Sequence, residues 1–288
     1  YRGITLVPVC YKLYCHVLNN RLNAWESENN ILCDVQNGFR KGRSTIDHVT
    51  SLTSIMETRK CNRLSTFVAF IDFRKAYDCI DRTILFRKLQ SIGIQGNIYN
   101  AIQSLYKSVE CCVRINGCKT DWFNVSCGLK QGCLLSPLLF NFYINDLATH
   151  LTSLNLGVDI GGEKVSVLLC ADDLVLFANS ENELQTLLDS MNIWCVNNNM
   201  TVNGNKSNVL HFRPNSSPRS AANFKCGNIT LKTVDKYTYL GLVLTEHLDY
   251  QIMAKHVAAA ANRALGLLIS KHKSFGGFPF RTFSKLYD

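Results

Sequence analysis

Apolar residues occur along the chain in short runs that end at polar or turn-forming residues, and these runs predict strands and helices. Residues 66–71 are rich in β-branched and aromatic side chains, which favours a strand that ends at Asp72. Residues 165–170 and 174–177 are two further apolar runs of strand length. They flank Ala171, Asp172 and Asp173, so a hairpin with acidic residues at its tip is predicted.

Four other segments carry the period or the boundary signals of helices. Asp81 begins a helical pattern that Gly93 closes, because glycine favours the left-handed backbone just past a helix end. Ser136 as N-cap, followed by Pro137 at the first helical position, predicts a helix through Leu147. The other two are the stripe of Ile98, Ile102, Leu105 and Tyr106 and the helix after the capping box of Ser180 and Glu183.

Turn signals separate these elements. Asn116 and Gly117 form a strong hairpin signal between residues 111–115 and 122–126. Residues 207–222 have the proline and serine content of a loop. Because strands and helices alternate irregularly, the pattern predicts an α+β fold.

The charge balance favours a polyanionic partner. The 288 residues carry 31 Lys and Arg against 22 Asp and Glu, and a net charge of +9 suits nucleic acid. An anionic membrane surface is the alternative on charge alone, but we see no basic amphipathic helix to support it. No apolar stretch reaches the roughly 20 residues that span a bilayer, so no membrane partner is expected.

The 13 cysteines do not form a recognisable metal or disulfide pattern. No pair has C-x-x-C spacing, and Cys133, Cys170 and Cys195 lie in apolar runs, where cysteine behaves as a small hydrophobe. Reduced, buried thiols of an intracellular protein are therefore expected. No targeting segment distinguishes nucleus from cytoplasm.

Asp72, Asp172 and Asp173 lie at the ends of rigid apolar strands. A lone aspartate in such a place is most often a turn former or a helix cap. Two adjacent carboxylates between apolar strands, however, repel each other unless a cation or solvent relieves them. If the strand of Asp72 lies beside the hairpin, three carboxylates converge, and oxygen-only ligands favour Mg²⁺. The spacing alone leaves open whether these strands meet.

Six short motifs follow one another along nearly the whole chain. They are Gln36-Asn37-Gly38-Phe39-Arg40 with Ser44-Thr45, Phe70-x-Asp72-x-x-Lys75-Ala76-Tyr77-Asp78, Gly128-Leu129-Lys130-Gln131-Gly132-Cys133-x-x-Ser136-Pro137, Cys170-Ala171-Asp172-Asp173, Met200-x-x-Asn203 with Lys206-Ser207, and Tyr239-Leu240-Gly241. In this order they resemble the fingers, palm and primer-grip motifs of non-LTR (LINE-type) retrotransposon reverse transcriptases. Each motif alone is a weak signal, but six in the family's order are not expected by chance.

The resemblance implies a right-hand polymerase fold of fingers, palm and thumb. In this α+β fold a small antiparallel palm sheet carries the aspartates and is backed by helices. The implied division is N-terminally truncated fingers at 1–65, a first palm strand at 66–83, a fingers–palm connection at 84–127, the palm at 128–245 and a partial thumb at 246–288.

The activity that the resemblance implies is RNA-directed DNA polymerisation with an RNA template, a DNA primer and deoxynucleoside triphosphates. Asp72, Asp172, the assisting Asp173 and the carbonyl of Phe73 would hold two Mg²⁺ ions, with Mn²⁺ as a substitute. Lys206 would donate a proton to the leaving pyrophosphate or neutralise it. By sequence alone, a solvated surface lysine is the alternative for Lys206.

The resemblance also implies contacts to nucleotide and nucleic acid. Tyr77 would lie under the sugar and exclude a 2′-hydroxyl by its bulk. Gln131 and Gly132 would touch the nucleotide, and Arg2 would grip the triphosphate. Template or primer contacts would come from Gln36, Gly38 and Arg40, and the primer-grip turn from Tyr239, Leu240 and Gly241. Further basic candidates for the nucleic-acid backbone are Lys41, Arg43, Arg59, Lys60, Arg63, Lys255 and Arg263.

Two departures from the family pattern and two alternatives accompany this interpretation. Cys170 replaces the usual aromatic residue before Ala-Asp-Asp, and Gly3 stands where the family usually has proline. A group II intron-like or telomerase-like polymerase is one alternative. The other is a catalytically inactive remnant that binds nucleic acid, against which the retained aspartates and Lys206 argue. The parent protein is expected to carry an endonuclease domain upstream.

Overall fold

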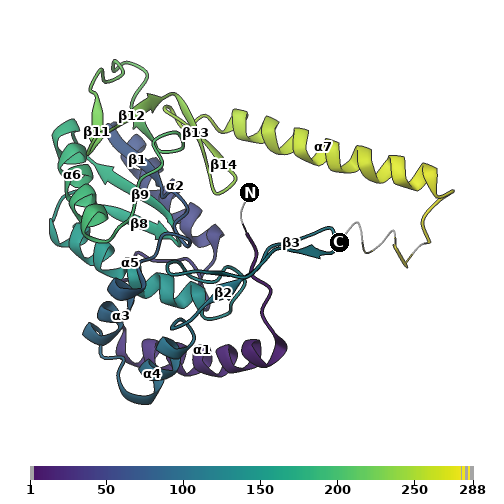
Figure 1. Cartoon of the computed structure of the whole chain (residues 1–288). Helices are drawn as coiled ribbons and strands as arrows, with labels where there is room; N and C mark the ends of the chain where they lie inside the picture. Colours follow the sequence, from purple (N-terminus) through teal and green to yellow (C-terminus); the bar gives the residue numbers. More distant parts are fainter. Residues whose placement is uncertain (1–2, 280, 283–284, 286–288) are drawn as a thin grey trace.

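A six-stranded sheet forms the centre of the computed structural model, which describes residues 3–279, 281–282 and 285 (Figure 1). In order across the sheet the strands are β11 (Phe224–Cys226), β12 (Ile229–Val234), β10 (Asn208–Phe212), β1 (Thr66–Asp72), β9 (Asp173–Ala178) and β8 (Val167–Cys170). Every neighbouring pair is antiparallel except β10 and β12. The antiparallel palm sheet that the sequence predicts is therefore present.

Strand β1 lies in the middle of this sheet and is buried on both faces. Side chains alternate between the faces of a strand, so Phe67, Ala69 and Ile71 enter one core and Val68 and Phe70 another. This two-sided burial explains why residues 66–71 form a nearly continuous apolar run.

Helices cover both faces of the sheet. The larger core includes residues of α5 (Ser136–Ser153) and α6 (Glu181–Asn197), which contact β8 and β9. The second core lies under α2 (Thr45–Cys61), and it also contains side chains of β13 (Lys236–Tyr239) and β14 (Leu242–Thr245). The predicted helical backing is confirmed.

Capping residues and a glycine mark the ends of several helices. Ser44 and Asp47 form a reciprocal capping box at the start of α2. Asp81 caps α3 (Arg82–Ser91) by accepting from two backbone N–H groups, and Gly93 follows with φ of 98°. The remaining elements are α1 (Val9–Asn29), α4 (Gly96–Ser104), β2 (Glu110–Cys111), β3 (Arg114–Ile115), β4 (Cys118–Lys119), β5 (Phe123–Asn124), β6 (Val158–Ile160), β7 (Glu163–Val165) and α7 (Tyr250–Ser274).

The turn at Asn116 and Gly117 is confirmed, although its strands are shorter than predicted. Both residues have positive φ, at 49° and 88°, as a tight hairpin turn requires. The turn joins β3 to β4, and an outer pair of β2 with β5 continues the ribbon.

Two predicted boundaries are wrong. Ser136 is not an N-cap, because Leu135 takes that position and the Ser136 hydroxyl donates to the Lys130 carbonyl at 2.8 Å. Residues 207–222 are not all loop, because β10 begins at Asn208 and pairs with β1. The short apolar run of β10 was assigned to the loop because prolines and serines follow it closely in the sequence.

Two further predictions need smaller corrections. The run 165–170 is interrupted at Ser166, so β7 and β8 are separate strands. Ser180 caps α6 by accepting from the Glu183 N–H, but the Glu183 carboxylate accepts from the N–H of Asn179. The reciprocal half of that capping box is therefore shifted by one residue.

Helix α7 extends from the sheet as an arm (Figure 1), and none of its residues is buried. Its base is held where the Tyr250 hydroxyl donates to Glu57 at 2.7 Å and the Val243 N–H donates to the Met253 sulfur. By length and composition only, it is the one helix among the described residues that could cross a membrane. The expectation that no segment reaches this length is therefore not met.

Candidate active site

Acidic residues lie together at one end of the central strands of the sheet, where β1 ends and β9 begins. Asp72 lies directly opposite Asp173 in the antiparallel register. Cys170 and Asp173 close the β8–β9 hairpin over Ala171 and Asp172. Directly opposed residues of such a pair project from the same face with Cβ atoms roughly 5 Å apart. The strand of Asp72 thus lies beside the hairpin, which is the condition for convergence that the sequence left open.

The negative charge of these carboxylates raises the pKa of neighbouring groups. Burial and the charges of Asp173 and Asp172 raise the pKa of the Cys170 thiol to about 11. Burial and the charges of Asp173 and Asp72 raise the pKa of Tyr237 to about 12. All three carboxylates therefore act on one small region, and a cation placed there gains from each of them.

The segment that follows α6 is bound to the end of β1 through the backbone. The Asn203 N–H donates to the Asp72 carbonyl and the Arg74 N–H donates to the Thr201 carbonyl, both at 2.8 Å. The Asp72 N–H in turn donates to the Ser207 hydroxyl at 3.0 Å. Both backbone groups of Asp72 are therefore satisfied, which fixes the position of its side chain.

Two side chains of the same segment contact the Asp72 carboxylate. The Asn203 amide donates to Oδ1 at 2.9 Å, and the Lys206 ammonium lies 3.8 Å from Oδ2. The Lys206 side chain is 61% exposed, so it is both near the carboxylate and free to reach a ligand. Lys206 therefore lies beside the Asp72 carboxylate, and its predicted role at the leaving pyrophosphate stays a prediction.

Tyr77 lies between two aromatic rings beside this region. Its ring stacks on Phe140 at 4.7 Å and meets the edge-on ring of Phe39 at 6.5 Å. Burial and the charge of Asp172 raise the pKa of Tyr77 well above its ordinary value. Among the described residues no partner bonds its buried hydroxyl.

The loop before α5 is joined to the Tyr77 segment. The Leu129 N–H donates to the Tyr77 carbonyl, and the Gln131 amide donates to Asp78 at 2.9 Å. Gly132 is exposed with φ of 103°, and the Gln131 carbonyl accepts from the Thr5 N–H. Gln131 and Gly132 thus lie near Tyr77, whereas Arg2 lies outside the described residues.

Gln36 and Gly38 support the β8–β9 hairpin instead of facing outward. Gln36 is 2% exposed, and its Oε1 accepts from the N–H groups of Gly38 at 2.7 Å and Ala171 at 2.9 Å. A Cβ on Gly38 would lie 2.1 Å from the Ala171 nitrogen. The template or primer contact predicted for these two residues is replaced by support of the turn that carries Asp172.

Arg40 also points into the protein. Its guanidinium donates to the carbonyls of Cys33 and Gln36 and lies 3.5 Å from Glu26. Arg59 is similarly buried and bonds to Thr66 and to the Ser65 carbonyl. Both arginines satisfy local carbonyl groups, so neither presents its charge to a nucleic-acid backbone here.

The primer-grip motif forms the turn of the β13–β14 hairpin. Leu240 and Gly241 have φ of 46° and 85°, and Gly241 is exposed. Tyr239 is instead 3% exposed, and its hydroxyl bonds to His48 Nε2 at 2.8 Å. Gly241 in the turn is therefore exposed, while the buried Tyr239 anchors the hairpin.

Comparison with known proteins agrees with this geometry. A family model described as reverse transcriptase (RNA-dependent DNA polymerase) matches residues 1–244. The chain belongs to this family. This reverse transcriptase domain is 28% identical over 249 residues to the Pol polyprotein of the R2 retrotransposable element of Popillia japonica, covering 84% of the chain and 34% of the relative.

Other relatives support the non-LTR, LINE-type assignment. The domain is 27% identical to the probable RNA-directed DNA polymerase from transposon BS of Drosophila melanogaster, covering 91% of the chain and 29% of the relative. It is 24% identical to the RNA-directed DNA polymerase from mobile element jockey of the same fly, covering 87% of the chain and 27% of the relative. The domain therefore spans between about a quarter and a third of the length of these relatives.

A solved structure shares the fold. Apo telomerase from Candida tropicalis aligns with a TM-score of 0.55 at 16% identity, over 83% of this reverse transcriptase domain and 45% of that chain. Telomerase from the same yeast with a fragment of telomeric RNA aligns with a TM-score of 0.54, at 14% identity, over 82% of the domain and 36% of that chain. This likeness establishes the polymerase fold.

Reverse transcriptases use divalent metal ions, and the carboxylates present fit such ions in chemistry. Among the described residues, no three His, Cys, Asp or Glu side chains are gathered closely enough to form a preformed metal site. Mg²⁺ is commonly held by only one or two carboxylates together with substrate phosphates. The opposed Asp72 and Asp173 and the adjacent Asp172 meet that requirement.

The Phe73 carbonyl is compatible with the same site. Phe73 forms an isolated antiparallel bridge with Val202. The hydrogen bonds of that bridge use the carbonyls of Asp72 and Thr201. The Phe73 carbonyl takes no part in them.

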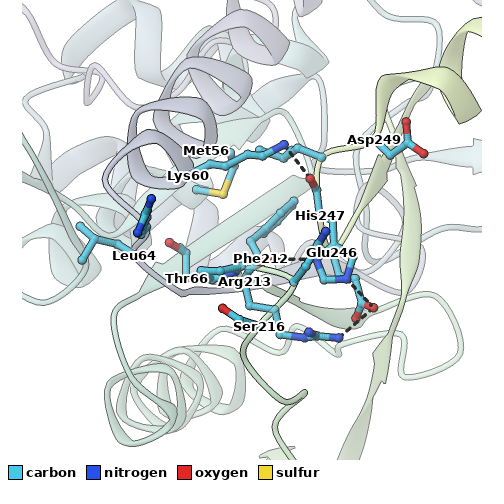
Figure 2. Close-up of a pocket in the computed structure, with 14 residues that line it drawn as sticks. Met56, Lys60, Leu64, Thr66, Phe212, Arg213, Ser216, Glu246, His247 and Asp249 are labelled. Atoms are coloured by element: carbon cyan, nitrogen blue, oxygen red, sulfur yellow. Dashed lines mark hydrogen bonds and ion pairs between the residues drawn. The ribbon is translucent and has the colours of Figure 1, made fainter.

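A cavity of about 760 Å³ lies away from the carboxylates, at the other end of β1 (Figure 2). Thr66, the first residue of β1, lines it together with side chains of α2 and of the turn before α7. Within it, Glu246 is paired with Arg213 at 3.0 Å and Lys60 donates to the His247 carbonyl. Of its two carboxylates, Glu246 is paired with Arg213 and Arg219, and Asp249 caps α7 by accepting from the Gln251 N–H.

Several contacts of motif residues were not predicted from sequence. Asn203 and Ser207 stand in a predicted motif, but their bonds to Asp72 were not foreseen, and neither was the bond of His48 to Tyr239. Arg82 is buried and donates to the carbonyls of Gly128, Val125 and Cys127, which holds the loop before α5. The one available signal was the Met200-x-x-Asn203 motif, because the other residues are ordinary helix or turn residues in sequence.

Substituting Gly38 with alanine is expected to lower the free energy of unfolding by about 1–3 kcal/mol, the usual effect of overpacking. The added Cβ would collide with the Ala171 backbone, which cannot move without displacing the catalytic turn. Urea unfolding measures the loss. Gly266→Ala is the matched control, since a Cβ there meets nothing within 4 Å. Equal effects of the two substitutions would contradict the proposed support.

The free energy of unfolding is expected to decrease as the pH is lowered, because of His48. Burial lowers the pKa of its imidazole to about 4 in the folded chain, against roughly 6.5 when unfolded. Below pH 6.5 the unfolded state binds the extra proton, so stability is full above pH 6.5 and is lost progressively toward pH 4.

This effect can be measured with a His48→Gln variant, which removes the titrating group. Between pH 7.5 and 5, the wild type should lose about 2 kcal/mol more of its unfolding free energy than the variant. Urea titrations at both pH values measure the difference. Identical pH dependence of the two proteins would show that His48 is not buried in its neutral form.

Proposed function

We propose that this domain catalyses the RNA-templated addition of deoxynucleotides to a DNA 3′-hydroxyl. The observation that carries the proposal is the register that sets Asp72 opposite Asp173, beside Asp172, in a chain of the reverse transcriptase family. Several relatives are named as RNA-directed DNA polymerases. The partners are an RNA template, a DNA primer and deoxynucleoside triphosphates.

Asp72, Asp172 and Asp173, together with the Phe73 carbonyl, are proposed to hold two Mg²⁺ ions, for which Mn²⁺ can substitute. When bound, such ions activate the attacking hydroxyl and neutralise charge on the phosphoryl oxygens. Asn203 holds one oxygen of Asp72 at 2.9 Å, which orients the other oxygen toward the reacting groups. The backbone bonds of Asp72 and Ser207 keep this orientation during the reaction.

Lys206 is proposed to donate a proton to the leaving pyrophosphate or to neutralise its charge. The ammonium starts 3.8 Å from Asp72, and the exposed side chain has the freedom to move to a departing phosphate. Tyr77 is proposed to lie under the incoming sugar, since its stacking on Phe140 holds the ring rigidly beside Asp172. Gln131, Gly132 and Arg2 would complete the nucleotide site.

The template and primer would lie between the carboxylates at the end of β1 and the turn of the β13–β14 hairpin. The exposed turn of Leu240 and Gly241 is proposed to contact the primer. The lobes would follow the division into fingers, palm and thumb inferred from sequence, with α7 in the partial thumb. We also propose an intracellular location, in nucleus or cytoplasm, and an endonuclease domain elsewhere in the parent protein.

Asp172→Asn is expected to reduce primer extension on an RNA template by at least about 1,000-fold, because it removes charge from the metal site. The assay contains Mg²⁺, all four deoxynucleotides and a labelled DNA primer. Asp189→Asn on the exposed face of α6 is the matched control and should retain activity. Chelation by EDTA should abolish extension by the wild type.

Tight, salt-sensitive binding of primer and template without extension would instead identify a nucleic-acid-binding remnant. Extension that survives Asp172→Asn would show that the carboxylates are not the reacting centre. Either outcome overturns the proposed function.

Tyr77→Val is expected to raise incorporation of ribonucleotides relative to deoxynucleotides by about tenfold or more, because it removes the ring that blocks a 2′-hydroxyl. Tyr77→Phe keeps the ring and removes only a hydroxyl that has no partner among the described residues, so its discrimination should remain unchanged. Ratios of kcat/KM for the two nucleotide types measure both variants. Unaltered discrimination in Tyr77→Val would exclude the steric role.

A further inference from the structure

A buried chain of polar side chains connects the segment around Gln36 to the primer-grip hairpin. The amide nitrogen of Asn37 lies 3.3 Å from His48 Nδ1, and His48 Nε2 lies 2.8 Å from the Tyr239 hydroxyl. His48 has no exposed surface and Tyr239 is 3% exposed. Buried polar groups of this kind are costly unless they are bonded, so each holds its partner in place.

The direction of these hydrogen bonds follows from Arg43. Its guanidinium donates to Asn37 Oδ1 at 2.9 Å, which turns the amide nitrogen toward His48. Asn37 therefore donates to Nδ1, and the proton of the neutral imidazole is on Nε2. His48 consequently donates to the Tyr239 hydroxyl.

The segment at the near end of this chain is fixed to the sheet. The Asn37 N–H donates to the Leu169 carbonyl at 2.8 Å, and the Leu169 N–H donates to Val35 at 2.9 Å. Residues 35–37 thus run beside β8 as a short parallel bridge. Gln36, the middle residue, reaches the Ala171 turn beside Asp172.

Adjacent residues of this segment therefore reach the two turns that polymerisation needs. Gln36 holds the catalytic turn, and Asn37 reaches the primer-grip turn through His48. The β13–β14 hairpin is also packed on β1 through aromatic rings. The ring centroid of Phe70 lies 4.4 Å from that of Tyr237 and 5.2 Å from that of Tyr239. Stacking restrains the hairpin's distance from the sheet, whereas the directional bond from His48 restrains its register.

Resting on the proposed function, we infer that His48 is a positioning residue that sets the primer-grip turn relative to the catalytic aspartates. It acts through Tyr239 and touches neither substrate nor metal ligand. The Leu240–Gly241 turn lies one residue beyond Tyr239, so a change at the hydroxyl is transmitted to the backbone that would meet the primer 3′ end.

The test uses His48→Phe, which keeps a planar ring and removes both nitrogens, and Tyr239→Phe, which removes only the hydroxyl. Steady-state primer extension separates KM for the primer–template from KM for the nucleotide. Each single variant should raise the primer–template KM about fivefold to tenfold, because each removes the bond between His48 and Tyr239, and leave the nucleotide KM within about twofold. The double variant should be no worse than the more impaired single variant, because both remove the same bond.

Two controls separate positioning from general destabilisation. His211 is also a buried histidine, but it stacks on Phe67 and accepts from the Ser220 N–H. His211→Phe should lower stability without changing the ratio of the two KM values. His48→Gln should recover part of the effect, because its amide nitrogen can replace Nε2 as the donor to Tyr239.

A second readout does not depend on catalysis. A 2-aminopurine base at the primer 3′ end brightens when it is less firmly held. His48→Phe and Tyr239→Phe should raise its fluorescence in the bound complex, and His211→Phe should not. Failure of the wild type to extend would remove the proposed function and leave this comparison intact.

Three results would overturn the inference. The first is multiplication of the two single effects in the double variant. The second is an effect on the nucleotide KM that equals the effect on the primer–template KM. The third is unchanged 2-aminopurine fluorescence in His48→Phe, including the case in which no primer–template binds.

Discussion

The pairing of β1 with β9 is the constraint on which the site depends. It places Asp72 opposite Asp173 and closes the β8–β9 hairpin so that Asp172 lies in the adjacent turn. Strand β1 is buried on both faces, and a slip of one residue would move every apolar side chain to the wrong core. Hydrophobic burial therefore fixes the position of carboxylates that repel one another.

The carboxylate edge is stabilised by groups that come from elsewhere in the chain. Asn203 and Lys206 contact the Asp72 carboxylate, while Ser207 bonds its backbone. These contacts offset part of the desolvation and repulsion that three neighbouring acids create. The same segment is tied to the primer-grip hairpin, because the Tyr237 hydroxyl donates to the Lys206 carbonyl.

The motif around Gln36 has a different use from the one its sequence suggests. Gln36, Gly38 and Arg40 read as a polar loop able to meet nucleic acid, but their polar groups are used inside the protein. Gln36 and Arg40 bond backbone groups through their side chains, and the backbone of Gly38 bonds to the side chains of Gln36 and Asn141. Gly38 is required because its neighbour is backbone, which cannot yield as a side chain does. This motif thus supports the turn of Ala171 and Asp172.

The sequence determined the features that depend on neighbours along the chain. Strand periodicity and local backbone chemistry predict the apolar run that ends at Asp72, the acidic hairpin tip, the Asn116-Gly117 turn and the helix that begins near Asp81. The order of the motifs also gave the polymerase family. The strand β10 was not visible, because only its partner β1 makes residues 208–212 a buried strand.

The tertiary structure decided which polar groups meet. His48 and Tyr239 are separated by 191 positions in sequence, and Asn203 and Asp72 by 131. Periodicity shows which face of an element is apolar, but it carries no information about the distant partner of a polar side chain. Whether Gln36 or Arg40 turns outward or inward is set by the burial of carbonyl and N–H groups that exist only once the sheet has formed.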